Sequence, residues 1–165
     1  MMVTVPAYAS SNIAAYPILG TQSVIDFDAP RNLLVSQEDE LSWLATTAAR
    51  HRLRNLFTLP DNWDGHGSSK PDFEAVARAY GMVLALYQIA ALSGYGWTNP
   101  NVSADECGAI VFEWWRGRLK LTIYVTAIQI SYIRVWGNNV DTEMEDGSID
   151  SLELDFTPLW GWLNS

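Results

Sequence analysis

The chain has 165 residues, 48% of them hydrophobic, a length that suits one domain with a sizeable core. It carries 19 acidic against 10 basic residues, and its formal charge of −9 disfavours binding to the phosphates of DNA or RNA. A single cysteine excludes an intrachain disulfide framework and is typical of a reducing compartment. No apolar run reaches the roughly 18 residues of a membrane span, and the first residues lack the basic segment of a secretory signal. We therefore expect a cytoplasmic protein that binds neither nucleic acid directly nor a membrane.

Residues 1–37 show no sustained hydrophobic period, which predicts an irregular N-terminal arm followed by a single domain over residues 38–165. The first helix is predicted from Ser36 to Phe57, because acids follow a capping serine and arginines occupy the last turns. Pro60 ends it. Its predicted core stripe is Leu41, Leu44, Ala45, Ala48, Leu53, Leu56 and Phe57.

A loop dense in turn-forming residues, from Asn62 to Pro71, separates the first helix from the second. Asp72 is predicted to cap this second helix, which runs from Phe73 to about Leu92 and is apolar on nearly all sides. Such a helix is expected to lie against a sheet. Its predicted stripe is Phe73, Val76, Ala77, Tyr80, Val83, Leu84, Tyr87 and Ala91.

The hydrophobic period changes to two after Pro100, which indicates β-strands. We predict a short strand near Asn101–Ser103, three antiparallel strands at 108–115, 118–126 and 128–136, and a tight turn at Arg116-Gly117. In the middle strand Leu119, Leu121, Ile123 and Val125 should face the helices, and Lys120, Thr122 and Tyr124 should face outward, where a partner could bind.

Gly137–Asn139 is predicted to end this meander, Ser151–Phe156 alternates like a further strand, and residues 158–163 are expected to form an aromatic tail. The predicted fold class is therefore α+β, with two helices packed on one face of an antiparallel β-meander of about four strands.

No catalytic or metal-binding constellation stands out, so we expect neither a metal nor a cofactor. In the glycine-rich turn, Asp64 should accept hydrogen bonds from backbone amides while Trp63 packs into the core. Glu113 is expected to pair across a hairpin with Arg118 or Lys120. The alternative is a small hydrolase that uses Asp64, His66 and Glu113.

Acidic residues concentrate between positions 141 and 155, after the last basic residue, Arg134. Eight tryptophans and seven tyrosines are more than a domain of this size buries fully, and both residue types are enriched in interface hot spots. The expected partner is a basic protein or ribonucleoprotein. The predicted partner-binding residues are Asp141, Glu143, Glu145, Asp146 and Asp150, with Tyr132, Trp136, Trp160 and Trp162.

One ordered set of residues resembles a set of small α+β proteins of bacteria, their phages and mobile elements. It consists of an N-W-D-G-x-G turn, a proline before an apolar helix, a P-x-V segment and a G-x-I-x-hydrophobic-E-W strand. The matching residues are Asn62, Trp63, Asp64, Gly65, Gly67, Pro71, Pro100, Val102, Gly108, Ile110, Glu113 and Trp114. The resemblance covers about residues 55–135 and implies an α+β domain of bacterial or phage origin, but no activity.

These observations favour a non-enzymatic binding protein that docks an acidic, aromatic surface onto a basic partner. A phage or mobile-element inhibitor of a nucleic-acid-binding host system, such as an anti-CRISPR protein, is the first expected form, and an antitoxin is the second. Besides the hydrolase, the remaining alternative is a self-associating module whose exposed strand face and N-terminal arm form a symmetric homodimer.

Overall fold

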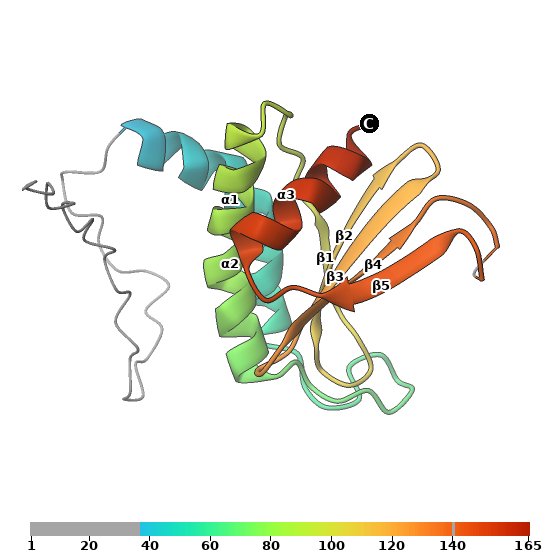
Figure 1. Cartoon of the computed structure of the whole chain (residues 1–165). Coiled ribbons are helices and arrows are strands. Elements are labelled where there is room, and N and C mark those ends of the chain that lie inside the picture. The colour runs from blue at the N-terminus through green and yellow to red at the C-terminus, as the bar shows by residue number, and fades with distance from the viewer. Residues whose placement is uncertain (1–36, 140) are drawn as a thin grey trace, which may run out of the picture. The chain divides into compact units, whose positions relative to one another are not determined.

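The computed structural model describes residues 37–139 and 141–165, so the predicted N-terminal arm and the capping role of Ser36 lie outside the described residues. Within these ranges there are three helices and five strands (Figure 1). The predicted α+β class is confirmed, but with one helix and one strand more than expected. In chain order the elements are α1 (Gln37–Leu56), α2 (Phe73–Leu92), β1 (Asn101–Ala104), β2 (Ile110–Arg116), β3 (Leu119–Val125), β4 (Ile130–Val135), β5 (Met144–Ser148) and α3 (Leu152–Leu163).

The five strands form one antiparallel sheet in the order β1-β2-β3-β4-β5, so each strand lies beside its neighbour in the sequence. The predicted tight turn joins β2 to β3: Arg116 pairs with Leu119, and Gly117 adopts a φ of 58° that favours glycine. The meander does not end at Gly137–Asn139 as predicted. The chain turns there, and the acidic segment returns as β5 beside β4.

The second helix has the predicted bounds because its start signal is local. The Asp72 carboxylate accepts a hydrogen bond from the Ala75 amide at 2.8 Å. The predicted stripe was only partly right, since Phe73 is 48% exposed and small residues bring the helix close to its neighbours. By length and composition α2 could also cross a membrane, although much of it is buried inside the fold. Its buried residues are Ala75, Val76, Ala79, Met82, Val83, Leu86 and Ala90.

The buried face of α1 differs from the predicted one: Ala48 is exposed, and Phe57 lies beyond the end of the helix and is 43% exposed. Leu41 and Leu44 are 55% and 63% exposed, whereas Thr46 is fully buried. The Thr46 hydroxyl donates a hydrogen bond to the Ser42 carbonyl at 2.9 Å, so its polar group is satisfied within the helix. The buried residues of α1 are Ser42, Thr46, Ala49 and Leu53.

The segment predicted as a last strand, Ser151–Phe156, is the beginning of α3. The Ser151 hydroxyl accepts a hydrogen bond from the Leu154 amide, and the Asp155 carboxylate accepts one from the Ser151 amide at 2.8 Å. The apparent alternation was misleading because the buried residues follow a helical spacing of three and four. They are Phe156, Leu159, Trp160 and Leu163.

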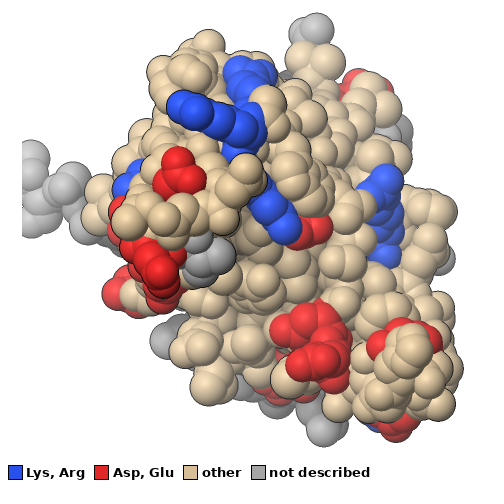
Figure 2. All heavy atoms as spheres, turned by 90° about the vertical axis from the view of Figure 1, so that its right-hand side faces the viewer, with Lys and Arg blue, Asp and Glu red and all other residues tan. Residues whose placement is uncertain are grey.

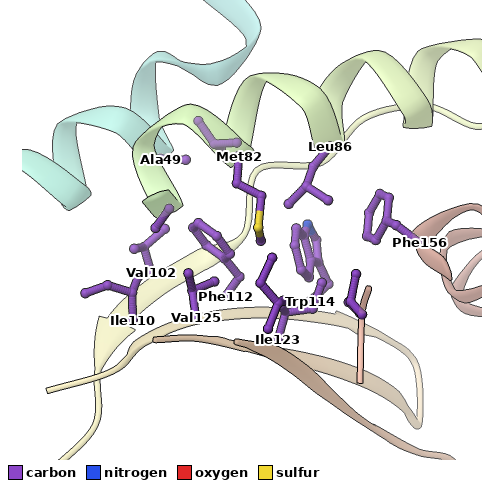
Figure 3. Packing of buried hydrophobic residues seen from close by; sticks show 14 of the residues in the cluster. Ala49, Met82, Leu86, Val102, Ile110, Phe112, Trp114, Ile123, Val125 and Phe156 are labelled. Atoms are coloured by element: carbon purple, nitrogen blue, oxygen red, sulfur yellow. The ribbon is translucent and has the colours of Figure 1, made fainter. Parts of the chain in front are cut away.

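The three helices pack against the sheet, and the core lies between these two layers. Figure 3 shows Phe112, Trp114 and Ile123 of the sheet pointing toward Met82 and Leu86 of α2, with Phe156 of α3 beside them. We call the opposite side of the sheet, whose residues alternate with the core residues, the open face. Its residues are Asn101, Ser103, Val111, Glu113, Trp115, Lys120, Thr122, Tyr124, Ser131, Ile133, Val135, Met144, Asp146 and Ser148.

Candidate functional site

The strand that carries the acidic residues, β5, forms an edge of the sheet, with β4 as its only strand neighbour among the described elements. The backbone N–H of Trp136 donates to the Glu143 carbonyl at 3.0 Å, and the backbone N–H of Ile149 donates to the Ile130 carbonyl at 2.9 Å. Because the direction of backbone groups alternates along a strand, residues 144, 146 and 148 turn their N–H and C=O groups to the free side. An edge with unpaired backbone groups is a template for another strand.

Three carboxylates of the acidic segment have structural partners. Glu145 forms an ion pair with Arg134 (Nη2 to Oε2, 2.5 Å), and Glu143 accepts a hydrogen bond from the Asn139 amide at 2.9 Å. Asp155 caps α3. These groups stabilise the β4–β5 hairpin and the chain that follows it, so they are less available to a partner than predicted.

The remaining carboxylates of the segment are exposed and form no ion pair or side-chain hydrogen bond with other residues in the described part of the chain. These carboxylates lie along the chain from the β4–β5 turn, through β5, to the first turn of α3. We call β5 together with these carboxylates the acidic edge. The carboxylates are Asp141, Asp146, Asp150 and Glu153.

The predicted anchors Tyr132, Trp136 and Trp162 surround one residue that the sequence analysis did not single out, Arg134. Its guanidinium carbon lies 5.9 Å from the Trp136 ring centre and 5.5 Å from that of Trp162. The two rings are 6.4 Å apart and nearly perpendicular. This cluster joins β4 to the end of α3. The polar residues at alternate positions of β4 were the signal that was missed.

Hydrogen bonds within this cluster shift two ionisable groups. The Arg134 guanidinium, and then the Tyr132 hydroxyl, lower the pKa of Glu145 because both donate hydrogen bonds to its carboxylate. Burial, and then the bond to the Glu145 carboxylate, raises the pKa of Tyr132. Tyr132 therefore remains a neutral donor and Glu145 an anionic acceptor near neutral pH.

Trp160 is not a surface anchor, and this part of the prediction was wrong. Its side chain is 1% exposed. Its ring centre lies 5.8 Å from those of Trp97 and Trp114 and 5.5 Å from that of Phe156. Many of the aromatic residues therefore pack between α3 and the sheet, and they do not all lie on the surface.

The glycine-rich turn is held by its own side chains, as the sequence predicts. The Asp64 carboxylate accepts hydrogen bonds from the Ser68 hydroxyl and the His66 amide, which lower its pKa in that order of importance. Trp63 packs against the core, and its indole N–H donates to the Ser69 carbonyl at 3.2 Å. The prediction that Asp64 and Trp63 stabilise this turn is confirmed.

The residues of the hydrolase alternative do not converge. Glu113 pairs with Lys120 at 2.6 Å, one of the two expected cross-hairpin partners. The loop that carries Asp64 joins the opposite end of β2, where the Asp72 amide donates to the Gly108 carbonyl. Five residues of strand, roughly 16 Å, separate Gly108 from Glu113. No group of three or more His, Cys, Asp or Glu suited to a metal ion occurs among the described residues.

Comparisons with known proteins add no assignment. No protein-family model matches the chain, and neither a curated protein nor a solved structure matches it.

Proposed function

We propose that the protein is a non-enzymatic binding protein whose acidic edge receives an extended, basic segment of a partner protein. The observation that supports this is the combination in β5 of unpaired edge backbone with exposed carboxylates at Asp146 and beside the strand. Backbone hydrogen bonds provide affinity in strand addition, and side chains at alternate positions provide specificity. The free edge of β5 meets the first requirement, and Asp146 in the strand, with Asp141 and Asp150 beyond its ends, meets the second.

The spacing of the carboxylates determines where the partner segment needs basic residues. An incoming strand pairs with the outward N–H and C=O groups of residues 144, 146 and 148. Lysine or arginine at every second position then lies on the same side as Asp146, and basic residues beyond its ends meet Asp141 and Asp150. The net charge of −9 speeds the encounter with such a partner.

The partner is a basic protein or a ribonucleoprotein of the cytoplasm. Carboxylates at the acidic edge occupy positions on a basic groove that nucleic-acid phosphates would otherwise occupy. This mode suits an inhibitor of a nucleic-acid-binding host system, of the anti-CRISPR or antitoxin type, from a phage or mobile element.

Affinity capture from bacterial lysate tests the role of the charges. Wild-type protein and the control E74K/E106K should retain basic proteins, and D146K/D150K, which has the same net charge as the control, should lose them. Salt near 1 M, where the Debye length is about 3 Å, should release most of the bound material. Capture of the same proteins by D146K/D150K and by wild type would refute the proposal.

A second pair of variants tests strand addition. The Ser148 N–H points to the free side, so Ser148→Pro removes a donor needed by the incoming strand and leaves the β4–β5 ladder intact. The captured partner should bind Ser148→Pro at least about tenfold more weakly, whereas Ser148→Ala should bind like wild type. Equal binding by both variants would show that the partner does not extend the sheet.

A further inference from the structure

The open face carries apolar side chains where a solvated sheet surface would be polar. In β4, Ile133 and Val135 point to the open face, and Tyr132 and Arg134 point to the helices. In β5, Met144 points to the open face and Glu145 points away from it. A sheet with one face in water shows the reverse alternation. Ser131, Asp146 and Ser148 on the same face are polar and Ile130 packs into the core, so the inversion is confined to the end of these strands beside the β4–β5 turn, where Ile133, Val135 and Met144 form an apolar patch.

Two aromatic residues extend this surface toward β2 and β3. Trp115 is 55% exposed, and the Lys120 ammonium group lies 5.0 Å from its ring centre. Tyr124 lies further along β3 on the same face, two residues from Thr122, which is only 4% exposed. Five strands about 4.8 Å apart and about six residues long cover roughly 24 Å by 20 Å. A two-fold axis between β3 and β4 overlaps only β2–β5, so two copies bury roughly 800 Å² in projection, the size of a small interface that needs ionic contacts as well.

Charges of opposite sign lie side by side at one end of this face. The β2–β3 turn is basic, with Arg116 and Arg118 exposed, and Lys120 beside it in β3 is paired with Glu113. The β4–β5 turn carries the exposed Asp141, and the exposed Asp146 follows in β5. Both turns lie at the same end of the sheet because strand direction alternates in a meander. Figure 2 shows the sheet side with basic side chains in the upper part of the view and acidic ones along its left and lower parts.

We propose that the open face is the interface of a symmetric homodimer. A two-fold axis parallel to the strands, between β3 and β4, places the basic turn of each copy over the acidic turn of the other. Both ionic contacts form at once, as an isologous interface requires. The two apolar faces then pack about 10 Å apart, like the layers of a β-sandwich. This inference does not depend on the proposed function, but both use Asp141 and Asp146, so a basic partner strand and the second copy compete for these carboxylates.

Light scattering on the full chain tests the proposal with variants in which the charge of one turn is reversed. Wild-type protein should have the mass of a dimer. The variants R116E/R118E and D141K/D146K should each be monomeric, because each presents two turns of the same sign to its own copy. An equimolar mixture of the two variants should again have the mass of a dimer, with one copy of each variant.

Two controls make the result specific to this face. The variant E74K/E106K, whose net charge equals that of D141K/D146K, should remain dimeric. Trp115→Ala should weaken association by about tenfold or more, because Trp115 is exposed on the part of the open face that β2 contributes and tryptophan is a typical hot-spot residue. Far-UV circular dichroism and urea unfolding confirm that each variant is folded.

Wild-type protein that stays monomeric at its highest soluble concentration would overturn the proposal, whatever else covers the open face. Dimers that persist in both charge variants would overturn it as well, since they would form through another surface. R116E/R118E leaves the acidic edge unchanged, so this variant should still bind the basic partner. Loss of dimerisation and loss of partner binding are thus separate outcomes.

Discussion

The ring of Tyr132 lies directly over Gly147 on the adjacent strand. The two residues are paired in register, and a Cβ atom at position 147 would lie 2.7 Å from the Cε1 atom of the ring. The glycine therefore gives the ring the space from which its hydroxyl donates a hydrogen bond to Glu145 at 3.0 Å.

Gly147→Ala should destabilise the protein by about 1–3 kcal/mol, because the added methyl group displaces the Tyr132 ring. Urea unfolding measures the change. The matched control is Gly81→Ala in α2, where a Cβ meets nothing within 4 Å and should stabilise the helix by roughly 0.5–1 kcal/mol. Equal effects of the two substitutions would show that the ring does not need the space.

Gly108→Ala should destabilise the protein by about 2 kcal/mol or more. Gly108 has a φ of +87°, and a Cβ there would lie 2.6 Å from the Lys70 carbonyl oxygen, where backbone cannot yield easily. Gly117→Asn is the control, since asparagine tolerates the positive φ of that turn and has open space around its Cβ. Thermal unfolding of both variants measures the difference, and a wild-type midpoint for Gly108→Ala would contradict the close approach.

Trp160→Ala should cost about 3–5 kcal/mol of unfolding free energy, because the side chain is fully enclosed by core residues. Trp115→Ala, at an exposed position, should change the stability of the isolated chain by less than about 1 kcal/mol. Denaturation at low protein concentration separates the effect on the stability of the isolated chain from the effect on association. A small effect of Trp160→Ala would restore that residue as a candidate surface anchor.

The Asp64 carboxylate should make the free energy of unfolding depend on pH in the acid range. Its pKa is lowered in the folded protein, so the unfolded chain binds more protons in the acid range and the stabilisation is lost as pH falls through the folded value. Asp64→Asn should lower the unfolding midpoint at pH 7 and show little difference from wild type well below about pH 4. A constant deficit of Asp64→Asn at every pH would contradict the assignment.

Local signals determined which elements could be predicted from the sequence. The Asp72 cap and the Gly117 turn act within four residues, so α2 and the β2–β3 hairpin follow from the sequence directly. α3 was missed because Leu152, Leu154 and Phe156 alternate as in a strand. Leu154 is 75% exposed, which shows that the alternation did not mark a buried face.

The candidate site depended on contacts that no local pattern contains. The ion pair between Arg134 and Glu145 joins residues eleven apart and needs the register of β4 and β5. The acidic run was visible in the sequence, but only its position on an edge strand distinguishes carboxylates that stabilise the hairpin from those that face solvent. The burial of Thr46 likewise depends on how α1 packs, although its hydroxyl is satisfied locally by the Ser42 carbonyl.

The only thiol of the chain offers a direct distance measurement. Cys107 is exposed, and its amide donates to the Asp105 carboxylate at 3.0 Å, which restrains the backbone at the start of β2. One nitroxide label per copy would then give a single inter-label separation in pulsed electron paramagnetic resonance if two chains associate symmetrically. The same label on R116E/R118E would give no dipolar signal, so one position reports on assembly without any further cysteine.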